Sequence, residues 1–314
     1  MVSRNHHFVS RAFLKSFAWK NGKGLKIGMY DFIDKNKVET NIKNVAVVRD
    51  FNTVELEGED PEQVEKFLSQ FEQCIPEVAY LSDSTESIDD WDSESTEQLF
   101  FMMGLFAAKN PHVREVLEIY QKKVILSSLD QLTSSEERFN EFNRRSGLEN
   151  PPSYESVRNL VESDLIGVDL NQSASVGLEL KLASDLSKFF AARKWSFIRA
   201  DDESSPFITS DRPVCLDWLE PERIPQFFRN SPGFGCRGTV VTFPITPKTC
   251  LIGAFETEPF RDRRPKDLVP AVNATIIRHA NRQIFYPEGG FEFSTERGVH
   301  PSDDLQKILP PASS

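Results

Sequence analysis

The clearest periodic pattern along the chain is a helical one over residues 61–81. Apolar residues recur there at intervals of three or four, which places them on one face of a helix: Val64, Phe67, Leu68, Phe71, Ile75 and Val78. Pro61 suits the first turn of this helix. Pro76 lies inside the pattern, where its ring removes the backbone hydrogen bond to the carbonyl of Glu72 and therefore predicts a kink.

Further helical patterns occupy the start and the middle of the chain. Over residues 9–18, Val9, Phe13 and Phe17 are spaced by four and form one apolar stripe. Ser95 and Gln98 have capping-box spacing for a helix over residues 97–109. The remaining expected elements are a helix starting at Asn110-Pro111, a polar stretch over 131–152, and helices over 153–166 and 174–194.

Strand patterns lie at both ends of the chain. Residues 25–32 and 37–41 predict a hairpin that turns at 34–36. Short strand-like runs follow near the C-terminus, at 195–200, 207–210, 214–217, 239–243, 249–254 and 283–286, with one helical stretch at 271–280. This order predicts the α+β class, in which a helical middle region packs with antiparallel strands from the N-terminal hairpin and the C-terminal third.

We expect one two-lobed domain over residues 1–314. Its parts are a helix with a hairpin (1–60), a mainly helical part (61–194), a strand-rich part (195–290) and a tail (291–314). Residues 82–97 contain seven acidic residues and neither Lys nor Arg. This composition predicts a mobile, solvated loop that folding does not need.

Composition limits the class of protein. Of the 314 residues, 39% are hydrophobic and 27% are charged, as is typical of a globular protein. The net charge of −11 argues against coating nucleic acid over the whole surface and leaves a local basic groove open. No run approaches the ~18 apolar residues of a membrane helix, and residues 1–30 lack the apolar core of a signal peptide. We therefore expect a cytoplasmic protein with no membrane partner.

The cysteines lie far apart. Cys74, Cys215, Cys236 and Cys250 show no Cys-Xaa-Xaa-Cys spacing, which argues against a structural zinc site and against a disulfide scaffold. Four free thiols in a reducing compartment are the expected state.

One set of residues resembles a known family. The segment His7-Phe8-Val9-Ser10-Arg11, with Phe13-Leu14 and a closing Phe17, resembles the opening motif of the uncharacterised family catalogued as domain of unknown function 4238. Further matches follow in order: Tyr30-Asp31, Phe51-Asn52-Thr53, Glu72, Phe207-Ile208-Thr209-Ser210-Asp211-Arg212-Pro213-Val214, Phe243-Pro244-Ile245-Thr246-Pro247 and Asn273. Ser10 replaces the usual proline, and Arg212 replaces the usual asparagine. The resemblance covers residues 7–286 and implies a set of site residues without an activity.

His7 and Arg11 are the first candidates for chemistry. A histidine titrates near neutral pH and suits a general acid or base. Arg11 lies four residues further on, so a continuous helix would place both on one face, and its guanidinium fork suits a phosphate or carboxylate. The structural alternative is that His7 orients the N-terminal helix while Arg11 forms a salt bridge.

Asp211 and Glu72 are the candidate carboxylates. Asp211 follows a short apolar run, with the hydroxyls of Thr209 and Ser210 beside it, and functional groups often follow strand ends. Ser-Asp-Xaa-Pro is equally a common turn sequence. Glu72 lies one turn before Pro76, so the kink would aim it into a cleft, or it is a half-buried carboxylate paired with a cation. Thr209 and Ser210 are candidate substrate-binding residues, and the resemblance adds Asn273 to them.

Two functions remain open. The first is a phosphodiester-acting enzyme, a ribonuclease or DNase, in bacterial host defence. There His7 moves a proton, Arg11 holds the phosphate, and Glu72 and Asp211 bind a divalent metal or supply the second acid or base. Its partner would be nucleic acid or another phosphate-bearing ligand. The alternative is a non-catalytic anion- or protein-binding regulatory module. Under the first hypothesis, we expect His7, Arg11 and Asp211 to meet at one cleft.

Overall fold

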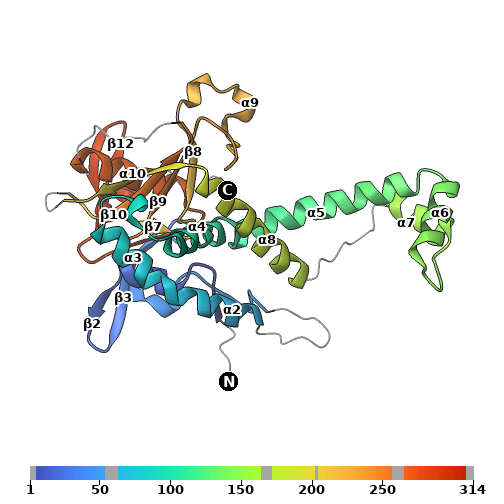
Figure 1. Cartoon of the computed structure of the whole chain (residues 1–314), viewed down its shortest axis with the longest axis horizontal. Helices are drawn as coiled ribbons and strands as arrows, with labels where there is room; N and C mark the ends of the chain where they lie inside the picture. Colours follow the sequence, from blue (N-terminus) through green and yellow to red (C-terminus); the bar gives the residue numbers. More distant parts are fainter. Residues whose placement is uncertain (1–4, 54–62, 164–171, 202–203, 257–264, 309–314) are drawn as a thin grey trace.

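The computed structural model describes residues 5–53, 63–163, 172–201, 204–256 and 265–308. A body of sheets and helices carries a long helical arm, formed by α5, α6 and α7, that projects to one side (Figure 1). Helices occupy the middle of the chain, and antiparallel sheets come from both ends. The predicted α+β class is confirmed.

The N-terminal segment forms a short strand and a short helix. Strand β1 (Asn5–His7) pairs antiparallel with β5 (Val47–Arg49). Helix α1 (Arg11–Leu14) begins after Ser10, whose Oγ accepts a hydrogen bond from the Ala12 N–H at 3.1 Å. One 3₁₀ turn, η1 (Lys15–Phe17), extends it. Because Ser10 caps the helix, α1 begins two residues later than the apolar stripe predicts.

Two antiparallel sheets join the ends of the chain. The first contains β2 (Trp19–Asn21), β3 (Gly24–Asp31), β11 (Gln283–Tyr286) and β7 (Thr209–Ser210) in that order, and β4 (Asn36–Asn41) also pairs with β3. The predicted hairpin is β3–β4. The second has the order β6 (Lys194–Arg199), β10 (Thr249–Ala254), β9 (Thr239–Pro244) and β8 (Cys215–Trp218).

The helical pattern before residue 85 is broken at the predicted position. Helix α2 (Gln63–Phe71) passes through a 3₁₀ turn, η3 (Glu72–Cys74), into α3 (Ile75–Ser84). Pro76 lies in the first turn of α3, where no intrahelical partner is lost. The break therefore falls at Glu72, as the proline predicts.

The acidic segment is folded, which overturns the prediction of a mobile loop over residues 82–97. It contains the end of α3, the 3₁₀ turn η4 (Ile88–Asp90) and the start of α4 (Ser93–Ala108). Trp91 is only 8% exposed, and its Nε1 donates to Thr85 Oγ1 at 2.7 Å. The apolar pair Ile88 and Trp91 packs into the core and orders its acidic neighbours. Asp92, not Ser95, caps α4.

The core lies between the second sheet and the central helices. Helix α4 packs on α8 (Gln172–Ala191), where a Cβ at Gly104 would lie 2.3 Å from the carbonyl oxygen of Ala183, so only glycine allows this approach. The Phe13 ring lies 4.8 Å from the Phe106 ring and 5.6 Å from the Phe243 ring, which joins α1, α4 and β9.

Two regions differ from the expected outline. The arm contains α5 (Pro111–Leu132), α6 (Glu136–Ser146) and α7 (Tyr154–Glu162), so helices occupy most of the predicted polar stretch. The predicted tail holds a hairpin, β12 (Glu292–Thr295) with β13 (Gly298–Pro301), which packs on α10 (Pro265–His279). The shorter elements are η2 (Ile42–Asn44), η5 (Pro221–Arg223), α9 (Gln226–Arg229), η6 (Ser302–Asp304) and α11 (Leu305–Ile308).

Candidate functional site

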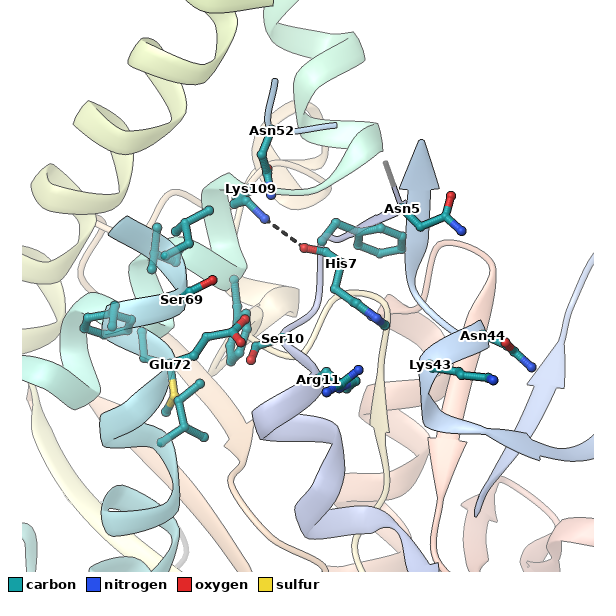
Figure 2. A pocket seen from close by; sticks show the side chains of 17 residues that line it. Asn5, His7, Ser10, Arg11, Lys43, Asn44, Asn52, Ser69, Glu72 and Lys109 are labelled. Carbon is teal, nitrogen blue, oxygen red and sulfur yellow. Dashed lines mark hydrogen bonds between the residues drawn. The ribbon is translucent and has the colours of Figure 1, made fainter. Parts of the chain in front are cut away.

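A pocket of about 570 Å³ opens where the N-terminal segment meets the central helices (Figure 2). Its walls come from β1, the start of α1, η2, α2 with η3, and the C-terminal half of α4. The break between α2 and α3 places η3 at the wall. The polar residues around it are Asn5, His7, Ser10, Arg11, Lys43, Asn44, Asn52, Ser69, Glu72 and Lys109.

The structure brings together three of the predicted site residues. His7 ends β1, Arg11 starts α1 and Glu72 lies in η3. His7 and Glu72 are half-buried, whereas Arg11 is exposed. In Figure 2 the Glu72 carboxylate points across the pocket toward Ser10 and Arg11, and the His7 imidazole points toward Arg11 from the other side. An imidazole, a guanidinium and a carboxylate therefore face one cavity.

The neighbouring His6 explains how His7 is held. Successive side chains of a strand point to opposite faces. His6 is 7% exposed, and its Nδ1 accepts a hydrogen bond from the Asn52 N–H at 2.9 Å. This bond ties β1 to the chain that follows β5, so His7 is presented to the pocket by a strand anchored on its other face.

Sequence reasoning missed Lys109, which is 8% exposed at the C-cap of α4. Its Nζ donates to the carbonyl oxygen of His7 at 3.0 Å and lies 5.4 Å from the centre of the Phe51 ring. A lysine directly after ten residues of apolar helix was the available signal, but its partner lies 102 positions away. Lys109 therefore positions His7 and also adds positive charge to the pocket.

The lining combines cationic and aromatic side chains. Arg11, Lys43 and Lys109 face one carboxylate, Glu72, among the lining residues that the structure describes. The rings of Phe8, Phe71 and Phe106 also line the pocket. This combination matches a ligand that carries a negative group on a flat, apolar body.

Asp211 does not belong to this pocket, and the predicted meeting of His7, Arg11 and Asp211 is wrong. Asp211 is 5% exposed, and its carboxylate accepts the backbone N–H groups of Asn281 at 2.8 Å, Arg282 at 2.6 Å and Gln283 at 3.0 Å. Burial raises the pKa of Asp211 and outweighs these bonds. The geometry supports a structural role for Asp211 but not the predicted local turn, because the bonded N–H groups lie about 70 residues away in sequence: Asp211 holds the start of β11.

The three other predicted substrate-binding residues also lie outside the pocket lining. Thr209 and Ser210 are buried in β7, and Ser210 Oγ accepts from the Arg212 N–H at 3.0 Å. Asn273 accepts from the Ile208 N–H at 3.0 Å and donates to the carbonyls of Pro206 at 3.0 Å and Glu292 at 2.8 Å. The Ser210 and Asn273 side chains thus bond to the backbone, whereas buried Thr209 Oγ1 has no hydrogen-bond partner among the described residues.

The described parts of the chain give less support to a metal site, to a reactive cysteine or to a membrane-spanning helix. They hold no group of three His, Cys, Asp or Glu side chains arranged to bind a metal. Cys74, Cys215, Cys236 and Cys250 are free, as the spacing predicts. Burial raises the pKa of both Cys215 and Cys250, which makes these thiols poor nucleophiles. None of the described helices combines the length and the apolar character needed to cross a membrane.

Comparison with known proteins identifies a family whose description names no activity. Residues 5–289 match the model described as "Protein of unknown function (DUF4238)". No curated protein matches the chain, and no solved structure does either.

Proposed function

Because the chain belongs to the DUF4238 family, whose description names no activity, we propose a function from the pocket itself: it binds RNA by a phosphate group and cleaves the phosphodiester. The observation that carries this proposal is that His7, Arg11 and Glu72 face one cavity from three different elements. A proton donor, an anion binder and a proton acceptor are the groups that metal-independent phosphoryl transfer needs.

The proposed step uses the 2′-hydroxyl of the RNA as the nucleophile. Glu72 accepts the 2′-hydroxyl proton as the oxygen bonds to phosphorus. The bond from phosphorus to the 5′-oxygen breaks, and protonated His7 gives that oxygen its proton. Arg11 holds the charged phosphoryl oxygens. The products are a 2′,3′-cyclic phosphate and a 5′-hydroxyl, so atoms and charge balance without an added reactant.

RNA fits the pocket better than DNA does. DNA has no internal nucleophile, and nucleases that cleave it commonly activate water with metal ions held by several carboxylates. Among the described lining residues, Glu72 is the sole carboxylate. Phe8 and Phe71 line the pocket and are half-buried, so an unpaired base would pack on their rings.

The anion-binding module is the second candidate. It is favoured by the buried contact between Lys109 and the His7 carbonyl, because this contact gives the His7 backbone a structural role independent of catalysis. In that case the pocket binds the phosphate ester and leaves it intact.

A panel of three variants separates these functions. Wild type, Glu72→Gln, His7→Ala and Arg11→Ala are incubated with a fluorescent single-stranded RNA in EDTA, and binding is measured by anisotropy. We expect Glu72→Gln and His7→Ala to lose cleavage about 100-fold or more while retaining binding, and Arg11→Ala to weaken both. Glu77→Gln and Lys15→Ala, exposed on α3 and η1, are the matched controls.

RNA that binds the wild type at the pocket and stays intact would support the module. RNA that neither binds nor is cleaved would contradict both functions.

A further inference from the structure

A second pocket of about 560 Å³ lies between the four-stranded sheet and α10. In Figure 1, β8 and α10 occupy the upper part of the body, and α2 of the first pocket lies in the lower part. The two pockets share no lining residue. The apolar lining of the second comes from the strands and from one face of α10: Leu216, Val240, Ile252, Leu268 and Val272.

Charged side chains gather at one edge of this second pocket. Asp217 Oδ2 accepts from Arg278 Nη2 at 2.7 Å and lies 3.0 Å from His279 Nε2. Burial alone would raise the pKa of Asp217, but His279 and Arg278 hold it below its usual value. This network fixes Arg278 at the edge of the pocket.

A second guanidinium approaches from α9. Arg229 lines the pocket and donates to the carbonyl of Ile224 at 3.1 Å. Within the described chain no ion pair joins Arg229 to a carboxylate. Two guanidiniums therefore face one carboxylate, and the edge retains a positive charge that a ligand anion would neutralise.

The two residues that precede Arg229 in sequence are exposed phenylalanines. Phe227 is 87% exposed and Phe228 is 58% exposed, with their rings 5.1 Å apart. Exposed aromatic rings next to Arg229 in the chain are available to cover the apolar surface of a ligand that Arg229 binds.

We propose that this second pocket binds an amphipathic anion, a medium-length aliphatic chain that ends in a carboxylate or phosphate. The aliphatic chain lies on the apolar lining between the sheet and α10, and the anionic group meets Arg278 and Arg229. The volume falls within the range of about 300–1,000 Å³ found for small-molecule sites. This site is independent of the proposed RNA cleavage.

The test is calorimetric titration of the full chain with decanoate, decyl phosphate, decanol and decyltrimethylammonium below their micelle concentrations. We expect the two anions to bind at least tenfold more tightly than decanol, and the cation not to bind. Their relative affinities decide between a carboxylate and a phosphate source. Arg229→Ala combined with Arg278→Ala should weaken decanoate at least tenfold. Arg223→Ala is the matched control, because its guanidinium pairs with Glu220 at 2.7 Å and does not line the pocket.

Two further variants locate the ligand. Thr275→Trp and Ala271→Trp each place a ring in the pocket from the half-buried face of α10 and should abolish binding while the protein stays folded. Glu72→Gln, in the other pocket, should bind decanoate like the wild type. The proposal is overturned if no anion binds, if decanol binds as tightly as decanoate, or if a correctly folded tryptophan variant binds unchanged.

Discussion

The ammonium group of Lys109, buried at the end of α4, donates a hydrogen bond to the backbone carbonyl of His7 at 3.0 Å. This contact ties the strand that carries the proposed acid to the central helix of the core. Arg114, five residues further along, is a second tie: it donates to the Phe51 carbonyl at 2.8 Å and pairs with buried Glu179 at 2.5 Å. The pocket is therefore assembled by long-range polar contacts.

Lys109→Met tests the positioning role. The variant keeps the apolar stem and loses the charged hydrogen bond, so we expect the free energy of unfolding to fall by about 1.5–3 kcal/mol. RNA cleavage should fall as well, because His7 loses its anchor. Urea unfolding and cleavage assays are compared with Lys123→Met, an exposed lysine of α5 whose change should cost less than about 0.5 kcal/mol. Unchanged stability and unchanged activity in Lys109→Met would contradict the role.

Asp211 separates the structural interpretation from the catalytic one. Asp211→Ala leaves three backbone N–H groups without their acceptor, so we expect a loss of about 3 kcal/mol or more in unfolding free energy. Cleavage per folded molecule should match the wild type. A variant with an unchanged melting midpoint and no activity would return Asp211 to the active site.

Asp31 gives the protein a defined pH dependence. Burial alone would raise its pKa, but hydrogen bonds from Gln283, the Asp34 N–H and Arg282 hold the pKa below the usual value. A carboxyl with a lowered folded pKa stabilises above its unfolded pKa of about 3.9 and loses this contribution as the pH falls through the folded pKa.

We therefore expect Asp31→Asn to reduce the free energy of unfolding by about 1.5–3 kcal/mol at pH 7. The difference from wild type should shrink as the pH falls below about 4. Urea titrations from pH 7 to pH 3 measure it, with exposed Asp89→Asn as the control. A difference that grows on acidification would contradict the assignment.

Trp91 tests the finding that the acidic segment, residues 82–97, is folded and packed on the core. Its ring packs in the core beside Phe197, with the ring centres 6.0 Å apart. Trp91→Ala should cost about 3–5 kcal/mol in unfolding free energy. Asp89→Ser should cost far less, because that side chain is exposed to solvent. Equal thermal midpoints for wild type and Trp91→Ala would restore the loop interpretation.

Local patterns predicted the local features of the fold. The β3–β4 hairpin, the strand β11 and the break before Pro76 follow from alternation and from the geometry of proline, which act within a few residues. The strands β1 and β5 have three residues each, too few for an alternation pattern, and their pairing spans about 40 positions.

Only part of the candidate site could be predicted, because local sequence shows residue type but not long-range contacts. His7, Arg11 and Glu72 carry chemistry that is visible in residue type, whereas Lys109 gains its role from a partner 102 residues away. Asp211 shows the converse error: it was predicted as a site residue although its role is structural, because a structural carboxylate and a catalytic one can have the same local sequence. The backbone N–H groups that distinguish them belong to a strand about 70 residues later.

The most direct test of RNA cleavage uses a DNA oligonucleotide with one ribonucleotide at its centre. Wild-type protein and Glu72→Gln are incubated with it in EDTA, and the products are identified by mass spectrometry. The proposed chemistry predicts cleavage by the wild type only on the 3′ side of the ribonucleotide, a 2′,3′-cyclic phosphate as the new end, and no product with Glu72→Gln. Cleavage at the deoxynucleotides, or an intact oligonucleotide under conditions in which it binds the wild type, would contradict it.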